Sequence, residues 1–240
     1  MNRPRQKHPH LSLSPVTSML LGLLGVSIVQ LYLAQSGFAA CLLSYDSAEP
    51  LPQGDGLARL SFQGGSDGFG THAEGRLGLT GDRSLHLRLG GCQRSELWGW
   101  ALEAGLNQRI LTTTDTGLVD LSVRVSAVAL FADDDQNSHS ELGFQPALLV
   151  SYPFELTSDR GGFVGLSLGV SSYFTDRRQR VEIQEGTGLQ EELFLSSEWL
   201  WRPMVALSGG VDILPMLPLS LEIRWQTDGL YGGVGVGYLF

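Results

Sequence analysis

The stretch Leu230-Tyr-Gly-Gly-Val-Gly-Val-Gly-Tyr-Leu-Phe240 alternates bulky with small side chains and stops on a phenylalanine. Successive side chains of a β-strand point to opposite sides, so Val234, Val236, Tyr238 and Phe240 fall on one face and the glycines between them on the other. One face meets an apolar environment, and the other leaves room for neighbouring groups. The pattern predicts the closing strand of a β-barrel.

The rest of the chain from residue 57 onward divides into similar segments with a period of two, separated by Gly, Asp, Ser, Thr or Pro. No segment has a convincing helical period. About ten strands are expected, an even number as in bacterial barrels, with 8 or 12 as alternatives. The predicted segments are 57–64, 69–79, 84–91, 97–108, 118–131, 142–155, 162–174, 196–213, 218–226 and 230–240.

The side of the sheet that faces outward decides between a membrane barrel and a soluble one. Both alternate apolar with polar residues, but a soluble barrel turns its apolar residues inward. Aromatic residues favour the membrane, because they gather toward strand ends as two belts, and a bilayer has two interfaces that attract such rings. The expected inner belt contains Tyr152, Phe154, Tyr238 and Phe240. The expected outer belt contains Phe62, Phe69, Trp98, Trp100, Phe131, Phe144, Phe174, Trp199, Trp201, Trp225 and Tyr231.

The terminal strand ending on Phe240, together with the alternating segments, resembles the class of small outer-membrane β-barrels. The resemblance implies an all-β, antiparallel, up-and-down transmembrane barrel in the outer membrane of a Gram-negative-type cell envelope. It also implies contact with membrane lipid and lipopolysaccharide, and reading of the C-terminal strand by the barrel assembly machinery. It identifies no specific family and no activity.

The first forty residues read as an export signal. Arg3, Arg5 and Lys7 form a basic start, residues 19–33 are an apolar core, and residues 37–39 offer a small-x-small cleavage site. A membrane-anchoring helix is the alternative, since the core nearly reaches the roughly 20 residues needed to span. The expected organisation is a signal peptide over 1–40, a loose lead-in or short plug over 41–56, and the barrel over 57–240.

The chain has two cysteines, Cys41 and Cys92, whose fate the sequence leaves open. Residues 38–41 resemble a lipoprotein processing box, with Phe38 in place of the usual leucine, so that Cys41 could carry lipid. A disulfide with Cys92 is the second alternative, because an exported chain enters an oxidising compartment. Such a bond would require residues 41–56 to thread the barrel interior, so a free or lipidated Cys41 ranks first.

Charge argues against nucleic acid as a partner. The chain has a net charge of -9, and residues 1–40 hold three basic and no acidic groups, so the remainder has 13 basic against 25 acidic side chains. Lys7 is the only lysine, which leaves arginine as the sole basic residue of the exported part. Arginine is suited to permanent, bidentate pairing with carboxylates or phosphates.

A network of opposite charges is expected in the lumen, where a narrow barrel favours pairing. A narrow polar pore for ions or small solutes is the alternative. The residues assigned to the lumen by their alternation are His72, Glu74, Arg76, His86, Arg88, Glu103, Asp120, Arg124, Arg202, Asp212, Glu222 and Arg224.

Two longer connections, Ala132–Glu141 and Thr175–Ser196, are expected at the outer side. The second reads as two strands that continue beyond the membrane as a hairpin, with arginines near lipopolysaccharide phosphates or with an edge for a surface protein. The residues proposed for this outer interaction are Arg177, Arg178, Arg180, Glu185, Glu191 and Glu192.

No catalytic motif is found, and no cofactor or metal is expected. The histidines available to a hydrolase are His72, His86 and His139, the last beside serines in a predicted loop. The acidic run 133–135 lacks the alternate spacing and glycine of a calcium loop. The favoured function is therefore a non-enzymatic structural, adhesion or surface-interaction role through the outer loops. The alternatives are a narrow channel, an outer-membrane hydrolase and a soluble periplasmic ligand-binding barrel.

Overall fold

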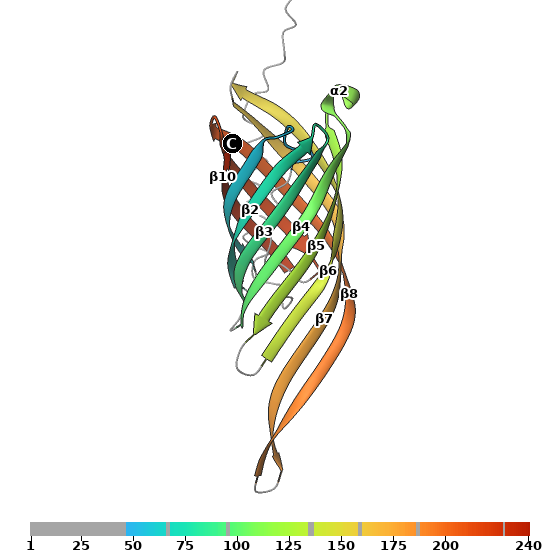
Figure 1. The fold of residues 1–240 in the computed structure, drawn as a ribbon, viewed down its shortest axis with the longest axis vertical. Helices are drawn as coiled ribbons and strands as arrows, with labels where there is room; N and C mark the ends of the chain where they lie inside the picture. Colours follow the sequence, from blue (N-terminus) through green and yellow to red (C-terminus); the bar gives the residue numbers. More distant parts are fainter. Residues whose placement is uncertain are drawn as a thin grey trace, which may run out of the picture.

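In the computed structural model the chain forms ten antiparallel strands that close into one barrel (Figure 1). The structure describes residues 47–65, 68–94, 97–133, 137–157, 160–185, 188–227 and 229–240, with side chains left aside at 94, 97, 137 and 177–194. The strands are β1 Gly56–Gly65, β2 Gly68–Thr80, β3 Arg83–Arg94, β4 Leu97–Leu111, β5 Asp120–Asp133, β6 Asn137–Thr157, β7 Arg160–Glu185, β8 Gly188–Leu214, β9 Leu217–Gln226 and β10 Gly229–Leu239.

Each strand pairs with its neighbours in sequence, and the barrel closes where β1 pairs with β10, from Leu57 opposite Leu239 to Gly65 opposite Tyr231. The predicted closing strand is therefore confirmed, as is the all-β, ten-stranded, up-and-down architecture. Full closure leaves no open sheet edge within the barrel wall, which is the condition for a sheet to cross a bilayer.

We define the inner end and the outer end of the barrel by the elements that lie there. The inner end carries the start of β1, the end of β10 and the short helix α2, Thr113–Thr116, and lies at the top of Figure 1. The outer end carries the long β7–β8 hairpin at the bottom of the view. All four inner hairpins contain a shift in register, at 78/80, 109/111, 155/157 and 212/214. Such bulges increase the local twist of the strands.

Helix α2 was not predicted: its residues lie between the predicted strands 97–108 and 118–131, and no helical period was found. Thr112 caps the helix with its hydroxyl group, which accepts a hydrogen bond from the Asp115 amide, and the Asp115 carboxylate accepts one from the Thr112 amide. Gly117, with φ 73°, ends the helix. One turn is too short to leave a helical period in the sequence. No helix in the described part of the chain is long and apolar enough to cross a membrane.

The sheet turns its apolar residues outward. Leu221 and Val125 are 53% and 49% exposed, whereas Glu222 and Arg124, next to them in sequence, are 2% and 0% exposed. A soluble barrel requires the opposite arrangement, so the alternative of a soluble periplasmic barrel is wrong. An apolar exterior around a polar interior is the surface of a transmembrane barrel, and the chain is an outer-membrane β-barrel.

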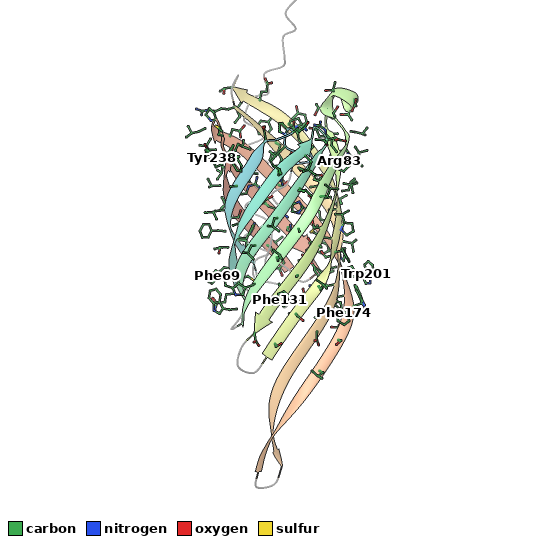
Figure 2. All side chains as sticks on the ribbon, in the orientation of Figure 1. Phe69, Arg83, Phe131, Phe174, Trp201 and Tyr238 are labelled. Carbon is green, nitrogen blue, oxygen red and sulfur yellow. The ribbon has the colours of Figure 1, made fainter. Side chains whose placement is uncertain are left out.

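Aromatic side chains ring the exterior toward the outer end, where Phe69, Phe131, Phe174 and Trp201 point away from the barrel, while Tyr238 lies near the inner end (Figure 2). Phe69 packs edge-on against Trp98, with ring centroids 6.1 Å apart. These positions match the predicted belts. Tyr231 was placed in the outer belt incorrectly: it is 7% exposed and turns inward.

The two predicted outer connections are both built from strands. The predicted outer loop Ala132–Glu141 is largely strand, because β6 begins at Asn137 and pairs with β7 from that residue onward. The hairpin predicted over Thr175–Ser196 is confirmed, with pairing that reaches Glu185 opposite Gly188. Outside the bilayer, lipid does not select apolar residues at alternate positions of a strand, so the sequence of such a strand resembles that of a polar loop.

The segment before β1 lies against the inner end of the barrel. Ala48 is fully buried, its amide donates to the Ser151 hydroxyl group at 3.1 Å, and its carbonyl oxygen accepts from the Ser122 hydroxyl group. Nearer β1, the Gly54 amide donates to the carbonyl oxygen of Gly78 at 3.0 Å. The described part of the predicted lead-in therefore contacts the wall of the barrel on β2, β5 and β6.

Candidate functional site

The strongest candidate site is the charged interior. Among the described residues, six arginines and five acidic residues are buried inside the barrel. They project from alternate positions of strands whose other face is apolar, which is why the same alternation that builds the exterior also gathers these charges. Desolvation makes such an interior costly unless the charges pair.

Glu74 lies at the centre of the first group. Its carboxylate accepts hydrogen bonds from Arg59 Nη1 at 3.1 Å, Arg76 Nη2 at 3.3 Å and Arg88 Nη2 at 3.2 Å. Strands β1, β2 and β3 thus contribute three guanidinium groups to one carboxylate. Glu74 is 3% exposed and Arg88 is fully buried.

Arg88 joins this group to the next strand. Its Nη1 lies 2.8 Å from Glu103 Oε1 on β4, and His86 Nε2 lies 3.1 Å from the same oxygen. We call these residues the central cluster: Arg59, Glu74, Arg76, His86, Arg88 and Glu103. The cluster has three permanent positive charges, on Arg59, Arg76 and Arg88, against the two carboxylates of Glu74 and Glu103, so arginine is in excess by one charge.

His86 also contacts the Ser126 hydroxyl group, at 3.2 Å, which brings a serine, a histidine and a glutamate together. Both contacts converge on Nε2 of the ring. A catalytic relay needs the nucleophile on one ring nitrogen and the orienting carboxylate on the other. The arrangement therefore does not form a triad, and it holds the ring in place instead.

A second group of charged side chains lies in the interior, on β5 and β9. Arg224 pairs with Glu222 on the same strand, with Nη2 3.0 Å from Oε1, and Arg124 lies in the electrostatic field of Glu222 and Glu103. All three of Arg88, Arg124 and Arg224 have 0% exposure.

The outer group joins β6, β7 and β8. Arg202 donates to both oxygens of Glu141, at 3.3 and 3.1 Å, and stands over the ring of Tyr173 at 5.3 Å from its centroid. His139 Nε2 lies 3.1 Å from Glu141 Oε1. His139 was expected on a solvated loop, and this was wrong: it lies in β6 and is 5% exposed. We call His139, Glu141, Tyr173 and Arg202 the outer cluster.

The structure brings together most, but not all, of the residues assigned to the lumen. Nine of the twelve belong to the groups above: Glu74, Arg76, His86, Arg88, Glu103, Arg124, Arg202, Glu222 and Arg224. His72 is also buried, at 2% exposure. Asp120 and Asp212 lie nearer the inner end and accept hydrogen bonds from the amides of Thr113 and Gly161.

Sequence reasoning missed Arg59, Glu141 and the position of His139. Arg59 lies on the same alternate positions as Ser61 and Gln63, opposite the apolar Leu60 and Phe62, so the alternation of β1 was sufficient to find it. Glu141 and His139 lay in what was predicted as a loop.

A cavity of about 360 Å³ opens at the inner end, between the segment before β1 and the ends of the later strands. Its walls include prolines and phenylalanines, with Pro52, Pro153 and Phe163 among them, and Arg59 and Arg76 line it as well. The central cluster is thus reached from the inner end.

The other sequence candidates fall partly outside the described residues. Arg177, Arg178, Arg180, Glu185, Glu191 and Glu192 lie on the paired backbone of the β7–β8 hairpin, and their side chains are outside the description. The Cys92 side chain is 5% exposed and takes part in a disulfide. Cys41 lies outside the described residues. In the described part of the chain, no group of three His, Cys, Asp or Glu could hold a metal ion.

Comparison with known proteins assigns the chain to no family. No protein-family model matches it, and no protein with a curated description does. Similar solved structures include the KdgM porin (8% identity, 76% of this chain and 98% of that chain, TM-score 0.39). They also include the translocator domain of the autotransporter NalP from Neisseria meningitidis (11%, 94% and 96%, TM-score 0.38) and the N-terminal barrel domain of Pseudomonas aeruginosa OprF (11%, 79% and 100%, TM-score 0.34). Similarity at this level transfers neither a ligand nor an activity.

Proposed function

We propose that this protein is a non-enzymatic outer-membrane anchor that presents the β7–β8 hairpin to a partner at the cell surface. The observation that carries the proposal is the length of the hairpin. β6 pairs with β7 only as far as Gln179, whereas β7 and β8 stay paired to Glu185 and Gly188 (Figure 1). We call residues 180–193 the ribbon.

The ribbon offers strand edges that neighbouring strands leave open. β9 pairs with β8 only from Met204 onward, so the outer edge of β8 from Gly188 to Pro203 has no paired neighbour among the described strands. Pro203 is the last residue of this unpaired stretch. Proline lacks the amide hydrogen that pairing with a neighbouring strand requires, so it is found at strand edges. An open edge can accept an extended segment of another protein through main-chain hydrogen bonds.

The sequence of the hairpin fits a charged surface partner. Arg177, Arg178, Arg180 and Glu185 come before the turn, and Glu191 and Glu192 follow it. Guanidinium groups bind phosphate or carboxylate with two parallel hydrogen bonds, so lipopolysaccharide phosphates are a natural contact for the arginines. Mixed charge also discourages pairing between copies through the open edge.

The buried charges of the interior support an anchor rather than an open pore. Arg88, Arg124 and Arg224 are fully buried at the level of the central cluster, with Glu103 and Glu222 at 1% and 2% exposure. Burial of these ion pairs supports a lumen that is closed at this level.

The test compares the full chain with a variant in which residues 180–193 are replaced by Asn-Gly, a sequence that favours a two-residue hairpin turn. The control replaces Thr113–Thr116 at the opposite end with a Gly-Ser linker. Both are checked for heat-modifiable gel mobility, then immobilised and exposed to outer-membrane vesicles. We expect the ribbon variant alone to lose at least tenfold in vesicle binding. Unchanged binding would rule out the ribbon as the interaction site, and binding of protein-free lipopolysaccharide vesicles would assign the partner as lipid.

A narrow channel is the second candidate, favoured by the surplus of arginine in the interior and by the cavity at the inner end. It predicts single-channel conductance in planar bilayers that changes when Arg124→Ala or Glu222→Gln is introduced. Absence of conductance from folded wild-type protein would remove the open-channel candidate.

A further inference from the structure

The cavity at the inner end is enclosed by the segment before β1 together with the barrel wall. Residues 47 and 49–52 line it from the segment, and the inner ends of β1, β2 and β6 to β10 supply the rest. Hydrogen bonds fix the segment in two places, from the Ala48 amide to the Ser151 hydroxyl group at 3.1 Å and from the Gly54 amide to the Gly78 carbonyl oxygen at 3.0 Å. The cavity is therefore formed before any ligand enters, as is usual for small-molecule sites.

The charged side chains that line the cavity are separated by depth. Arg59 and Arg76 are 6% and 8% exposed, whereas Asp212 is half-buried and Glu49 is exposed. Both arginines belong to the central cluster, in which they share the Glu74 carboxylate and positive charge is in excess by one. A molecule in the cavity thus meets positive charge at the buried floor and negative charge at the mouth.

A buried hydroxyl group adds a polar contact at the floor. Ser220 on β9 lines the cavity, is 1% exposed, and its hydroxyl group makes no hydrogen bond within the part of the chain that the structure describes. Beside it in the ladder is Gly235 on β10, where a Cβ atom would lie 2.9 Å from Arg59 Cδ. Buried polar groups are ordinarily hydrogen-bonded, so the Ser220 hydroxyl group calls for a partner from a ligand.

The size of the cavity and its apolar walls limit the ligand. A volume of about 360 Å³ is room for about a dozen water molecules at about 30 Å³ each, near the lower end of the range for small-molecule sites. Phe154 and Phe163, with Pro153 and Pro218, give it apolar surface. A molecule of amino-acid size with one apolar group fits these limits.

We propose that this cavity binds an amino acid with an apolar side chain, held as a zwitterion. The carboxylate of the ligand is bound at the floor by Arg59, Arg76 and the Ser220 hydroxyl group. A guanidinium group has five N–H donors, so each arginine can serve Glu74 and a second carboxylate. The ammonium group of the ligand faces the carboxylates at the mouth, and its side chain packs on the phenylalanine rings. The site lies at the end opposite the ribbon and does not depend on what the ribbon binds.

Titration of the full chain in micelles tests whether both charges of the ligand are recognised. Three probes share one aromatic ring: phenylalanine, phenylalaninamide, which lacks the carboxylate, and 3-phenylpropionate, which lacks the ammonium group. Ligand-observed NMR gives the dissociation constants, with empty micelles as the reference for partition into detergent. We expect phenylalanine to bind at least tenfold more tightly than either of the other two. Absence of phenylalanine binding, or equal binding of all three probes, would overturn the proposal.

Variants then assign each charge of the ligand to one end of the cavity. Ser220→Ala should weaken phenylalanine and 3-phenylpropionate at least threefold and leave phenylalaninamide unchanged. Removing a hydroxyl group that has no partner in the described chain should also leave the fold intact. Glu49→Gln should weaken phenylalanine and phenylalaninamide at least threefold and leave 3-phenylpropionate unchanged.

The matched controls are Ser84→Ala and Glu155→Gln. Ser84 is a buried serine and Glu155 an exposed glutamate, and neither is among the residues that line the cavity. Heat-modifiable gel mobility checks the folding of every variant, and both controls should bind all three probes as the wild type does. If Ser220→Ala and Glu49→Gln weaken all probes alike, or no more than the controls do, the cavity does not recognise the two charges and the proposal is wrong.

Discussion

The Arg88 guanidinium lies 2.8 Å from the Glu103 carboxylate across two neighbouring strands, and the two side chains are 0% and 1% exposed. The same guanidinium reaches Glu74 on the other side at 3.2 Å. Arg88 thus ties β2, β3 and β4 together from within, where a soluble protein would place an apolar core. Ion pairs therefore stabilise the interior of this barrel, and its apolar side chains contribute to stability by contact with lipid on the outside.

Removing Glu103 should therefore be costly. Glu103→Ala leaves His86 and one side of Arg88 without their partner, and breaking a buried ion pair costs about 3–5 kcal/mol. We expect a loss near 3 kcal/mol in the free energy of unfolding, since Arg88 keeps Glu74. Urea unfolding in lipid vesicles measures the change. The exposed Glu155→Ala should stay within about 0.5 kcal/mol, and equal losses for both would contradict the pairing.

The outward orientation of Val125 gives a second prediction. Val125→Arg places a charge on the lipid-facing side near the middle of β5 and should cost about 2–4 kcal/mol. Leu118→Arg, at 59% exposure just before β5, lies near the inner interface and should cost about 0–1 kcal/mol. The same unfolding measurement compares them. Equal losses in the free energy of unfolding for Val125→Arg and Leu118→Arg would contradict the bilayer depths assigned to these two residues.

The sequence predicted the wall of this barrel better than its interior. Alternation of two is forced by strand geometry, so the faces of β5 and β9 were legible from Asp120 to Phe131 and from Leu219 to Gln226. Which face points outward is not encoded in that alternation, and the aromatic belts were needed to decide it. Pairs such as Arg88 with Glu103 depend on the register between strands, and a shift of one residue changes every partner.

The errors have physical causes of a similar kind. His139 and Glu141 were lost in a predicted loop because β6 continues past the bilayer, where lipid no longer selects apolar residues on one face. Helix α2 is a single turn set by a cap, which leaves no periodic signal. Tyr231 turns inward although its ring type suits a belt, because its place opposite Gly65 in the ladder fixes its direction.

The segment before β1 can pack against β2 only because Gly78 has no side chain. A Cβ atom there would overlap the Pro52 carbonyl oxygen and lie 2.6 Å from that of Leu51, both backbone atoms. Gly78→Ala should displace the segment and lower the free energy of unfolding by about 1–3 kcal/mol. Gly75→Ala, on the same strand with nothing within 4 Å of the new Cβ atom, is the control and should be neutral. Protease cleavage within residues 47–55 should rise for Gly78→Ala only.

The cap of α2 gives a prediction about pH, outside the membrane-spanning strands. Hydrogen bonds from the Thr112 hydroxyl and amide groups hold the pKa of Asp115 below its ordinary value. A carboxyl group whose pKa is lowered by folding contributes stability that is present above its unfolded pKa and lost as the pH falls through the folded one. Thr112→Val removes the hydroxyl group, so the pKa of Asp115 should rise toward its ordinary value in a carboxyl NMR titration of the protein in micelles. Thr114→Val, in the same turn, should leave it unchanged, and an equal rise in both variants would show that the capping contact is not the cause.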